Sequence, residues 1–232
     1  MTERRPSLPD RVLAVYREKG LPGVWYAALA RAGVRRLVVF ERSLSAPLAA
    51  IAPPAGVTIR TLGPADEEAY APLGQETAAT FRRRLAAGHE CWGAWCEGAL
   101  RHVSWLAFSE VEVEHVGCRL LLADDVAYPY HSFTQQAYRG RGLSPARQVR
   151  SLAELRRRGF VLVVCAVAPE NRSAFPPVRK LGYHGVGTIT SVRVGAWCRV
   201  WCRLDAGAVA HGWRLDRTLG AARPAMAKTG GA

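Results

Sequence analysis

The sequence predicts a mixed α/β fold, in which a twisted sheet is flanked by helices and a helical hairpin precedes it. Three observations predict this class. A strand-like run over 124–133 leads into a glycine-rich turn and a helical stretch over 144–158. A hairpin is expected over 91–108, with Glu97-Gly98 as its turn. Further strand-like runs follow at 160–168, 186–194 and 196–204.

The front of the chain predicts two short helices over 10–33. Asp10 can cap the first helix and Gly20 ends it, while Pro22 opens the second and Gly33 ends that. A short strand over 34–40, a strand over 57–62 and a helix over 64–86 are expected next. The expected organisation is a basic helical hairpin plus short strand at 1–45, an Ala/Pro linker at 46–56, a catalytic domain at 57–204 and a frayed tail at 205–232.

The glycine-rich turn predicts a pyrophosphate site. Its glycines let the backbone approach a ligand, and the N-terminus of the following helix offers unpaired N–H groups and a positive dipole end. Ser144 is a suitable N-cap, with Pro145 at the first helical position. A Rossmann fingerprint needs a glycine where Pro145 stands, and the Gly-Lys-Ser/Thr of a Walker loop is absent from the sequence.

The turn and a later segment together resemble a known family. Arg139-x-x-Gly142-x-Ser144 resembles the signature Gln/Arg-x-x-Gly-x-Gly/Ala of the GNAT acyltransferases, with Ser144 as a small replacement for Gly or Ala. Asn171, followed by the run Lys180-Leu181-Gly182-Tyr183, is similar to the second cofactor segment of that family. The resemblance covers roughly residues 57–204.

This resemblance implies a mostly antiparallel sheet that is splayed at the cofactor, and acetyl-CoA as the acyl donor. It also implies that a backbone N–H on the strand before the turn, at Phe133 or Thr134, stabilises the oxyanion. The cofactor-binding residues implied are Phe133, Thr134, Arg139, Gly140, Arg141, Gly142, Leu143, Ser144 and Asn171.

One position departs from the family. A tyrosine that often donates a proton to the departing thiolate is replaced by Val178, and Pro176-Pro177 before it are expected to disturb the helix start. Since a thiol pKa near ~8.5 makes thiolate a tolerable leaving group, Tyr128, Tyr130 or water can substitute. The alternative is that acyl transfer has been lost and the domain only binds an acyl-CoA.

The general base has several candidates. Asp125 lies near the start of the strand that leads to the turn, and His131 lies nearer its reacting end, where little pKa shift is needed near neutrality. The alternative for His131 is a strand histidine that points into the core or away from the site. Glu110, Glu112 and Glu114 share one strand face, for which a solvated surface is favoured over a site for a cationic acceptor.

Composition limits which cellular compartment and which binding partners are expected. The formal charge is +13, of which residues 1–43 carry +5. A basic surface can steer anionic CoA or bind anionic membranes, and no nucleic-acid module accompanies it. The six cysteines form no Cys-x-x-Cys, so free thiols in a bacterial-type cytoplasm are expected, without a metal site. No run is long enough to span a membrane.

The predicted function is therefore transfer of an acetyl or other short acyl group from acyl-CoA to an amine. The alternatives are a non-catalytic acyl-CoA-binding module and a membrane-surface enzyme of envelope or polysaccharide assembly. The N-terminal hairpin has two interpretations. Either its Trp25 and Tyr26 face packs on the catalytic domain, or its arginine-rich face lies on anionic lipid. A homodimer is left open.

Overall fold

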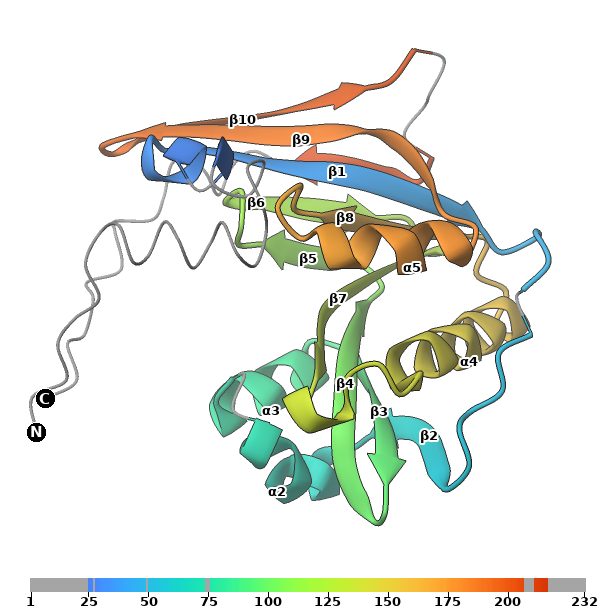
Figure 1. The fold of residues 1–232 in the computed structure, drawn as a ribbon. Helices are drawn as coiled ribbons and strands as arrows, with labels where there is room; N and C mark the ends of the chain where they lie inside the picture. Colours follow the sequence, from blue (N-terminus) through green and yellow to red (C-terminus); the bar gives the residue numbers. More distant parts are fainter. Residues whose placement is uncertain (1–24, 27, 49, 74–75, 207–210, 217–232) are drawn as a thin grey trace, which may run out of the picture.

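The computed structural model describes residues 25–206, except 27, 49, 74 and 75, and residues 211–216. Its centre is an eight-stranded sheet with the order β10-β9-β1-β8-β7-β4-β3-β2 (Figure 1). The strands are β1 (Val34–Ser43), β2 (Val57–Leu62), β3 (Glu90–Cys96), β4 (Ala99–Ala107), β7 (Val126–Thr134), β8 (Leu162–Val167), β9 (His184–Val194) and β10 (Trp197–Leu204).

The sheet opens between β7 and β8. These two strands are parallel and pair only at Val126 with Leu162 and at Ala127 with Val163, whereas the other neighbouring strands in the sheet are antiparallel. Beyond Ala127 the two halves of the sheet diverge, as Figure 1 shows. The mixed, mostly antiparallel fold expected from the sequence is therefore confirmed.

Strand β1 lies inside the sheet, although the sequence places it in a separate extension. It pairs with β8 on one side, Val39 opposite Ala166, and with β9 on the other, Leu37 opposite Ile189. Both of its faces are covered, because Val39 and Phe40 point to opposite sides and are 0% and 2% exposed. A continuous apolar run suits such a central strand. The expected boundary at residue 45 thus cuts through one sheet.

The helix expected over 64–86 is broken. It forms α2 (Glu67–Tyr70) and α3 (Ala78–Ala86), with 3-10 turns before and after α2. Pro72 lacks the N–H that a continuous helix would need, and Thr77 starts α3 anew by accepting a hydrogen bond from the Thr80 N–H at 3.2 Å. The segment that includes Glu76 is thereby left between two helices.

A smaller sheet of order β11-β6-β5 packs against the large one. It consists of β5 (Glu110–Val113), β6 (Cys118–Leu122) and β11 (Trp213–Asp216). The sequence predicts a frayed tail where β11 lies, and this part of the prediction is wrong. Trp213 is buried and its Nε1–H donates to the Glu41 carboxylate at 2.5 Å, which ties the strand to β1.

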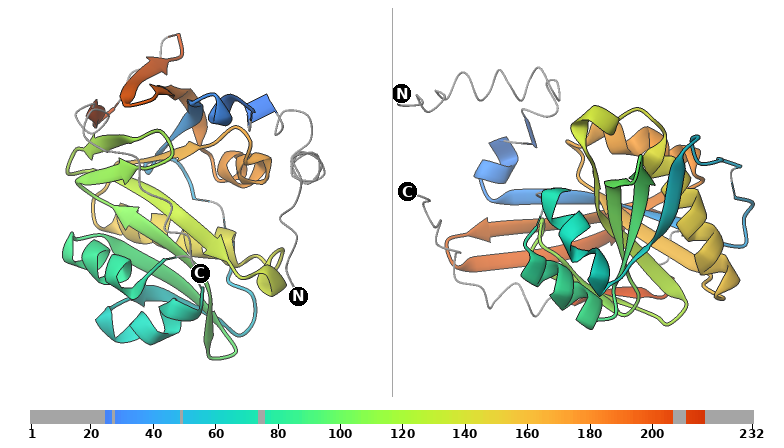
Figure 2. Two further views of the ribbon diagram at one scale, coloured as in Figure 1. Left: turned by 90° about the vertical axis from the view of Figure 1, so that its left-hand side faces the viewer. Right: turned by 90° about the horizontal axis from the view of Figure 1, so that it is seen from below.

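The remaining helices lie on the two halves of the large sheet. Helix α4 (Leu143–Arg157) packs on β2, β3 and β7, and α5 (Phe175–Lys180) lies beside β1 and β8 (Figure 1). The left view of Figure 2 shows α2 and α3 in teal, well away from the orange strands β9 and β10. Among the described residues no helix has the length and hydropathy to cross a membrane.

Most of the N-terminal hairpin expected over 10–33 lies outside the described residues. Residues 25–26 and 28–31 are helical, and Trp25 is 63% exposed. The six cysteines are free thiols, of which Cys91, Cys118 and Cys165 are buried.

Candidate functional site

The glycine turn after β7 has the backbone conformation of an anion-binding loop. Gly140 and Gly142 have φ values of 75° and 77°, which residues with a side chain rarely adopt. Gly142 is the N-cap of α4, and its carbonyl accepts from the Ala146 N–H at 3.1 Å. The predicted N-cap Ser144 is therefore the second residue of the helix, because the helix starts as soon as Gly142 has turned the chain.

The N–H groups of this turn are available to a ligand. Within the described part of the chain, the N–H groups of residues 140–142 donate to no backbone or side-chain acceptor. The N–H groups of Leu143 and Ser144 lie in the first turn of α4, where a helix has no internal acceptor for them. Five consecutive donors and the positive end of the helix dipole thus meet at one place.

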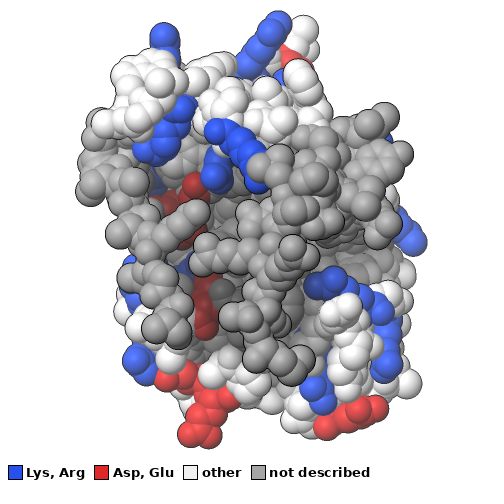
Figure 3. All heavy atoms as spheres, turned by 60° about the vertical axis from the view of Figure 1, so that its left-hand side comes forward, with Lys and Arg blue, Asp and Glu red and all other residues white. Residues whose placement is uncertain are grey.

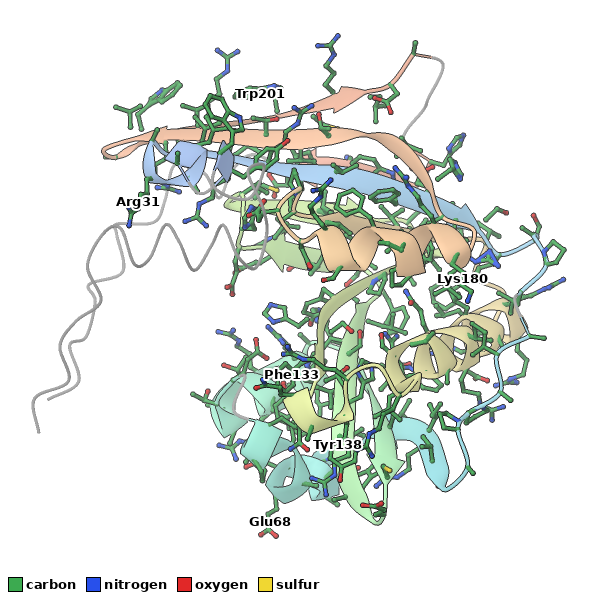
Figure 4. All side chains as sticks on the ribbon, in the orientation of Figure 1. Arg31, Glu68, Phe133, Tyr138, Lys180 and Trp201 are labelled. Atoms are coloured by element: carbon green, nitrogen blue, oxygen red, sulfur yellow. The ribbon has the colours of Figure 1, made fainter. Side chains whose placement is uncertain are left out.

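Arginines surround the turn and are held in place. The guanidinium groups of Arg101 and Arg141 lie over the Tyr138 ring, 4.5 and 4.8 Å from its centroid. Arg139 donates from Nε to the Thr134 carbonyl at 3.3 Å. Figure 4 shows Tyr138 and Phe133 at the same end of the molecule, where β7 runs into the turn. These cations add to the positive potential of the anion-binding site that the backbone forms.

A buried hydrogen-bond relay from Arg147 through His102 to Thr134 holds the end of β7 in place. Arg147 on α4 donates from Nε to His102 Nε2 at 3.3 Å, and His102 Nδ1 lies 2.8 Å from Thr134 Oγ1. Because arginine can only donate, His102 must accept at Nε2 and donate from Nδ1 to Thr134. Burial lowers the pKa of His102 to about 3 and that of Arg147 to about 10, so His102 is neutral and Arg147 charged. The sequence carries no signal for this relay.

His131 occupies a β-bulge on β7. Val103 pairs with Phe133 and Trp105 with Tyr130, so one residue of β4 faces two residues of β7. His131 takes a positive φ of 46° at this bulge. The extra residue breaks the strict alternation of the strand, and His131 lines the same cavity as Tyr130. No turn-forming residue marks the bulge, so the sequence could not predict it.

The Glu76 carboxylate connects His131 to Arg84 through hydrogen bonds. The Nδ1 of His131 lies 3.2 Å from Glu76 Oε1, and Arg84 binds both oxygens of the same carboxylate, with 2.6 Å between Nη2 and Oε1. The Arg84 and Glu76 side chains are only 9% and 12% exposed, whereas that of His131 is 42% exposed. Sequence analysis missed Glu76 and Arg84. The one available sign was Thr77, whose capping role leaves Glu76 outside α3.

These contacts set the protonation of His131. Burial lowers the pKa of His131, and the Arg84 charge lowers it further, while the Glu76 and Glu114 charges raise it. The imidazole is therefore neutral at neutral pH, with its pKa below the ordinary value. A carboxylate at Nδ1 holds the proton on that nitrogen and leaves the lone pair on Nε2. This is the arrangement of an oriented general base.

His131 lines a cavity of about 440 Å³ at the opened edge of the sheet. The walls come from β1, β5, β7, β8 and the turn after β5, and include Glu112 and Glu114. In Figure 3 a few acidic side chains are visible between the grey residues of this face, and basic ones lie around its edge. Glu112 and Glu114 are exposed, as the preferred interpretation of a solvated face expects, and they also line this cavity. Glu110 is exposed as well, is paired with Arg119 at 3.2 Å and is not a lining residue.

The second base candidate, Asp125, lies elsewhere. It precedes β7 at the end where that strand still pairs with β8, and it lines a different cavity of about 670 Å³ with Glu41 and His184. Six residues of extended chain separate it from His131, a distance of roughly 20 Å. The structure therefore does not bring the two candidates together.

The two tyrosines line the cavity of His131. Tyr130 bonds through its hydroxyl to His89 Nδ1, and the Tyr128 hydroxyl lies against the Ala166 backbone across the opening of the sheet. Burial raises the pKa of both phenols, so both stay protonated at neutral pH and are weaker acids than an ordinary tyrosine.

Asn171 stands apart from the glycine turn. It is exposed, it precedes α5, and its Oδ1 accepts from Ser173 Oγ at 3.0 Å. Its backbone N–H donates to the Ala168 carbonyl at 2.8 Å. None of its hydrogen bonds within the described residues reaches residues 139–144.

Val178 is part of the apolar core. It is 8% exposed and belongs to the cluster that includes Phe40, Leu152 and Leu181. Pro176 and Pro177 do not disturb the start of α5, which begins at Phe175, because the first turn of a helix needs no N–H donors.

Restoring a tyrosine at Val178 is therefore expected to overpack the core. Val178→Tyr should lower the free energy of unfolding by about 1–3 kcal/mol, as judged by urea denaturation, because no space is open to the ring. Val161→Tyr serves as the control, since Val161 is 51% exposed and should tolerate the ring. A Val178→Tyr protein as stable as the parent would show that this position faces open space.

Comparison with known proteins shows which fold this is. No family model matches the chain, and no curated protein matches it. An acetyltransferase of the GNAT family from Colwellia psychrerythraea superposes with a TM-score of 0.52 at 13% identity, covering 73% of this chain and 61% of that one. A GNAT-family protein from Novosphingobium aromaticivorans gives 0.51 at 19% identity, covering 68% and 62%.

A tandem GNAT protein from the clavulanic acid biosynthesis pathway gives a TM-score of 0.51 at 17% identity and covers 79% of this chain. The chain spans about three fifths of the length of these solved structures. At such identities the likeness shows the fold alone. The chain has the fold of the GNAT acetyltransferases, which confirms the resemblance at that level.

Proposed function

We propose that the protein is an acyltransferase that moves a short acyl group, most simply acetyl, from acyl-CoA to an amine. The observation that carries this proposal is the placement of two sites along β7. The glycine turn with five N–H donors follows β7 after one short 3-10 turn, and an oriented histidine faces a cavity only three residues before the end of β7. The turn would hold the pyrophosphate of CoA, and the acceptor would occupy the cavity.

The reaction assigns a role to each group. The acceptor binds as an ammonium ion, and His131 Nε2 takes one of its protons. The neutral amine then attacks the thioester carbonyl, so that a C–N bond forms as the C–S bond breaks. The second proton of the nitrogen passes to the CoA thiolate, relayed by Tyr128, Tyr130 or water, and His131 then releases its proton to solvent. Backbone N–H groups at Phe133 or Thr134 would stabilise the oxyanion.

Three features of the fold support these roles. The edge of β7 that faces the opening has no strand partner beyond Ala127, so its backbone is open to a ligand. The relay from Arg147 through His102 holds the Thr134 side chain in place, beside the backbone N–H groups proposed for the oxyanion. The bond from Glu76 orients His131, as second-layer carboxylates orient catalytic histidines in general.

Binding of CoA at the glycine turn predicts a specific stabilisation. CoA at 100 times its Kd should stabilise the parent by about 2.7 kcal/mol, seen as a rise in Tm. Gly142→Val should abolish that rise, because a β-branched residue cannot hold a φ of 77° and the turn must change shape.

The matched control is Gly159→Val at the other end of α4. Gly159 also has a positive φ, 89°, and open space around it, so the two variants suffer similar backbone strain. Gly159→Val should lower Tm but keep the response to CoA. A Gly142→Val protein that CoA stabilises as strongly as the parent would place the cofactor elsewhere.

A further inference from the structure

The hairpin of β9 and β10 exposes three large apolar side chains on one face. Val194, Trp197 and Trp201 are 66%, 55% and 38% exposed. Val194 is directly opposite Trp197 across the turn, and Trp201 is four residues further along β10, so the three share a face of the sheet. In Figure 1 the turn of this hairpin projects beyond the start of β1. An exposed apolar patch of this kind indicates an interaction surface.

Arginines are interleaved with this patch. Arg199 and Arg203 alternate with the two tryptophans on the same face of β10, and both are exposed. Arg36 of β1 lies in the same cross-strand row as Trp201, which Figure 4 shows on β10 at the edge of the large sheet. The sequence from 171 to 204 contains six Arg or Lys residues and no Asp or Glu. The surface is therefore both apolar and cationic.

The two kinds of side chain suit the two layers of an anionic membrane surface. Tryptophan is enriched where a bilayer meets water, because its ring is apolar and its N–H is polar. Arginine binds phosphate oxygens in pairs, and anionic lipids attract basic segments. The spacing also fits, since Arg199 follows the tip residue Trp197 by two positions, or roughly 7 Å of strand. An inserted tip would thus leave the arginine at the level of the headgroups.

We propose that the β9–β10 hairpin docks the protein on an anionic lipid bilayer. The tip around Val194 and Trp197 enters the boundary between headgroups and acyl chains, while Arg199 and Arg203 bind the headgroup phosphates. None of these four residues lines the cavity of His131. The docking surface is therefore separate from the site of the proposed reaction, and the inference does not depend on acyl transfer.

Two other partners fit this surface less well. A second copy of the chain in a two-fold contact would bring the same arginines together, and the segment 171–204 has no carboxylate to pair with them. A single-stranded nucleic acid could stack on the tryptophans and pair with the arginines. It would make no use of Val194, which is the most exposed of the three apolar side chains.

The test is co-sedimentation of the full-length protein with phosphatidylcholine vesicles, with and without one third phosphatidylglycerol. The parent should bind the anionic vesicles at least tenfold more tightly than the neutral ones, and salt should weaken this binding. Val194→Asp places a charge at the exposed tip and should weaken binding at least tenfold, as should Trp197→Ala/Trp201→Ala. Arg199→Gln/Arg203→Gln should have an effect of the same size on anionic vesicles.

Matched controls carry the same substitutions elsewhere. Val161→Asp changes a side chain that is 51% exposed, next to β8 at the end of β1 that is remote from the hairpin turn. Arg150→Gln/Arg156→Gln removes two exposed charges from α4. Both controls should bind vesicles as the parent does, and circular dichroism should show that every variant is folded.

Two results would overturn the inference. One is a parent that does not bind anionic vesicles, including a parent that instead dimerises or binds a single-stranded oligonucleotide through these residues. The other is vesicle binding that survives both Val194→Asp and the double tryptophan variant, because the membrane contact would then lie on another part of the chain.

Discussion

Deleting residues 1–43 is expected to abolish cooperative folding of the chain. The deletion removes β1, which is paired on both sides within the large sheet, so β8 and β9 lose their common neighbour at once. It also removes Leu37, Val39 and Phe40 from two hydrophobic cores. The measurement is thermal unfolding followed by circular dichroism, with aggregation followed by light scattering.

A single substitution tests the same point without shortening the chain. Phe40 is 2% exposed and meets the Phe175 ring edge to face, with 5.6 Å between ring centroids. Phe40→Ala should cost about 3–5 kcal/mol, or roughly 10 °C in Tm for a domain of this size. Arg36→Ala near the exposed start of the same strand should stay within ~0.5 kcal/mol. A truncated protein that melts like the parent would show that β1 is dispensable.

The second large effect is expected at His131. His131→Asn should lower kcat for acyl transfer by roughly 10²–10⁴-fold, the usual contribution of a positioned base. Asparagine accommodates the positive φ of this position and keeps a donor for Glu76, so the fold should be retained. His184→Asn is the control, because His184 is exposed and lines the other cavity.

The pH profile separates a base from a structural residue. The parent kcat should rise with pH through the pKa of His131, which lies below the ordinary value, and be level at neutral pH. Replacing Arg84 by Leu removes a charge that lowers this pKa, so the acidic limb should move to higher pH. In His131→Asn the limb should vanish. A profile unchanged in both variants would assign the base elsewhere.

The local signals in the sequence predicted most of the strands and the glycine turn. The hairpin over 91–108 is β3 and β4, and Glu97 and Gly98 have the positive φ values, 54° and 75°, of a tight turn. Such features depend on residues close in the chain. The position of β1 was not predictable in this way. Its apolar run indicates that the strand is buried, but it does not indicate which strands pair with it.

The candidate site was predicted in part for the same reason. His131 and the glycine turn were found because they lie on one continuous segment. Glu76, Arg84 and the relay from Arg147 to His102 come from separate elements, and each is an ordinary polar residue in its own segment. The broken helix before Thr77 and the bulge on β7 bring Glu76, Arg84 and His131 together. Both features depend on packing rather than on local pattern.

The most direct test of the account is product analysis with acetyl-CoA labelled in its acetyl carbonyl. The parent is incubated with an amine panel, and free CoA thiol and N-acetyl product are measured together. The account predicts equal amounts of the two, formed at least 100-fold more slowly by His131→Asn. Acetyl-CoA that binds at the glycine turn but transfers its acetyl group to no amine would contradict it, and would identify a non-catalytic acyl-CoA-binding protein.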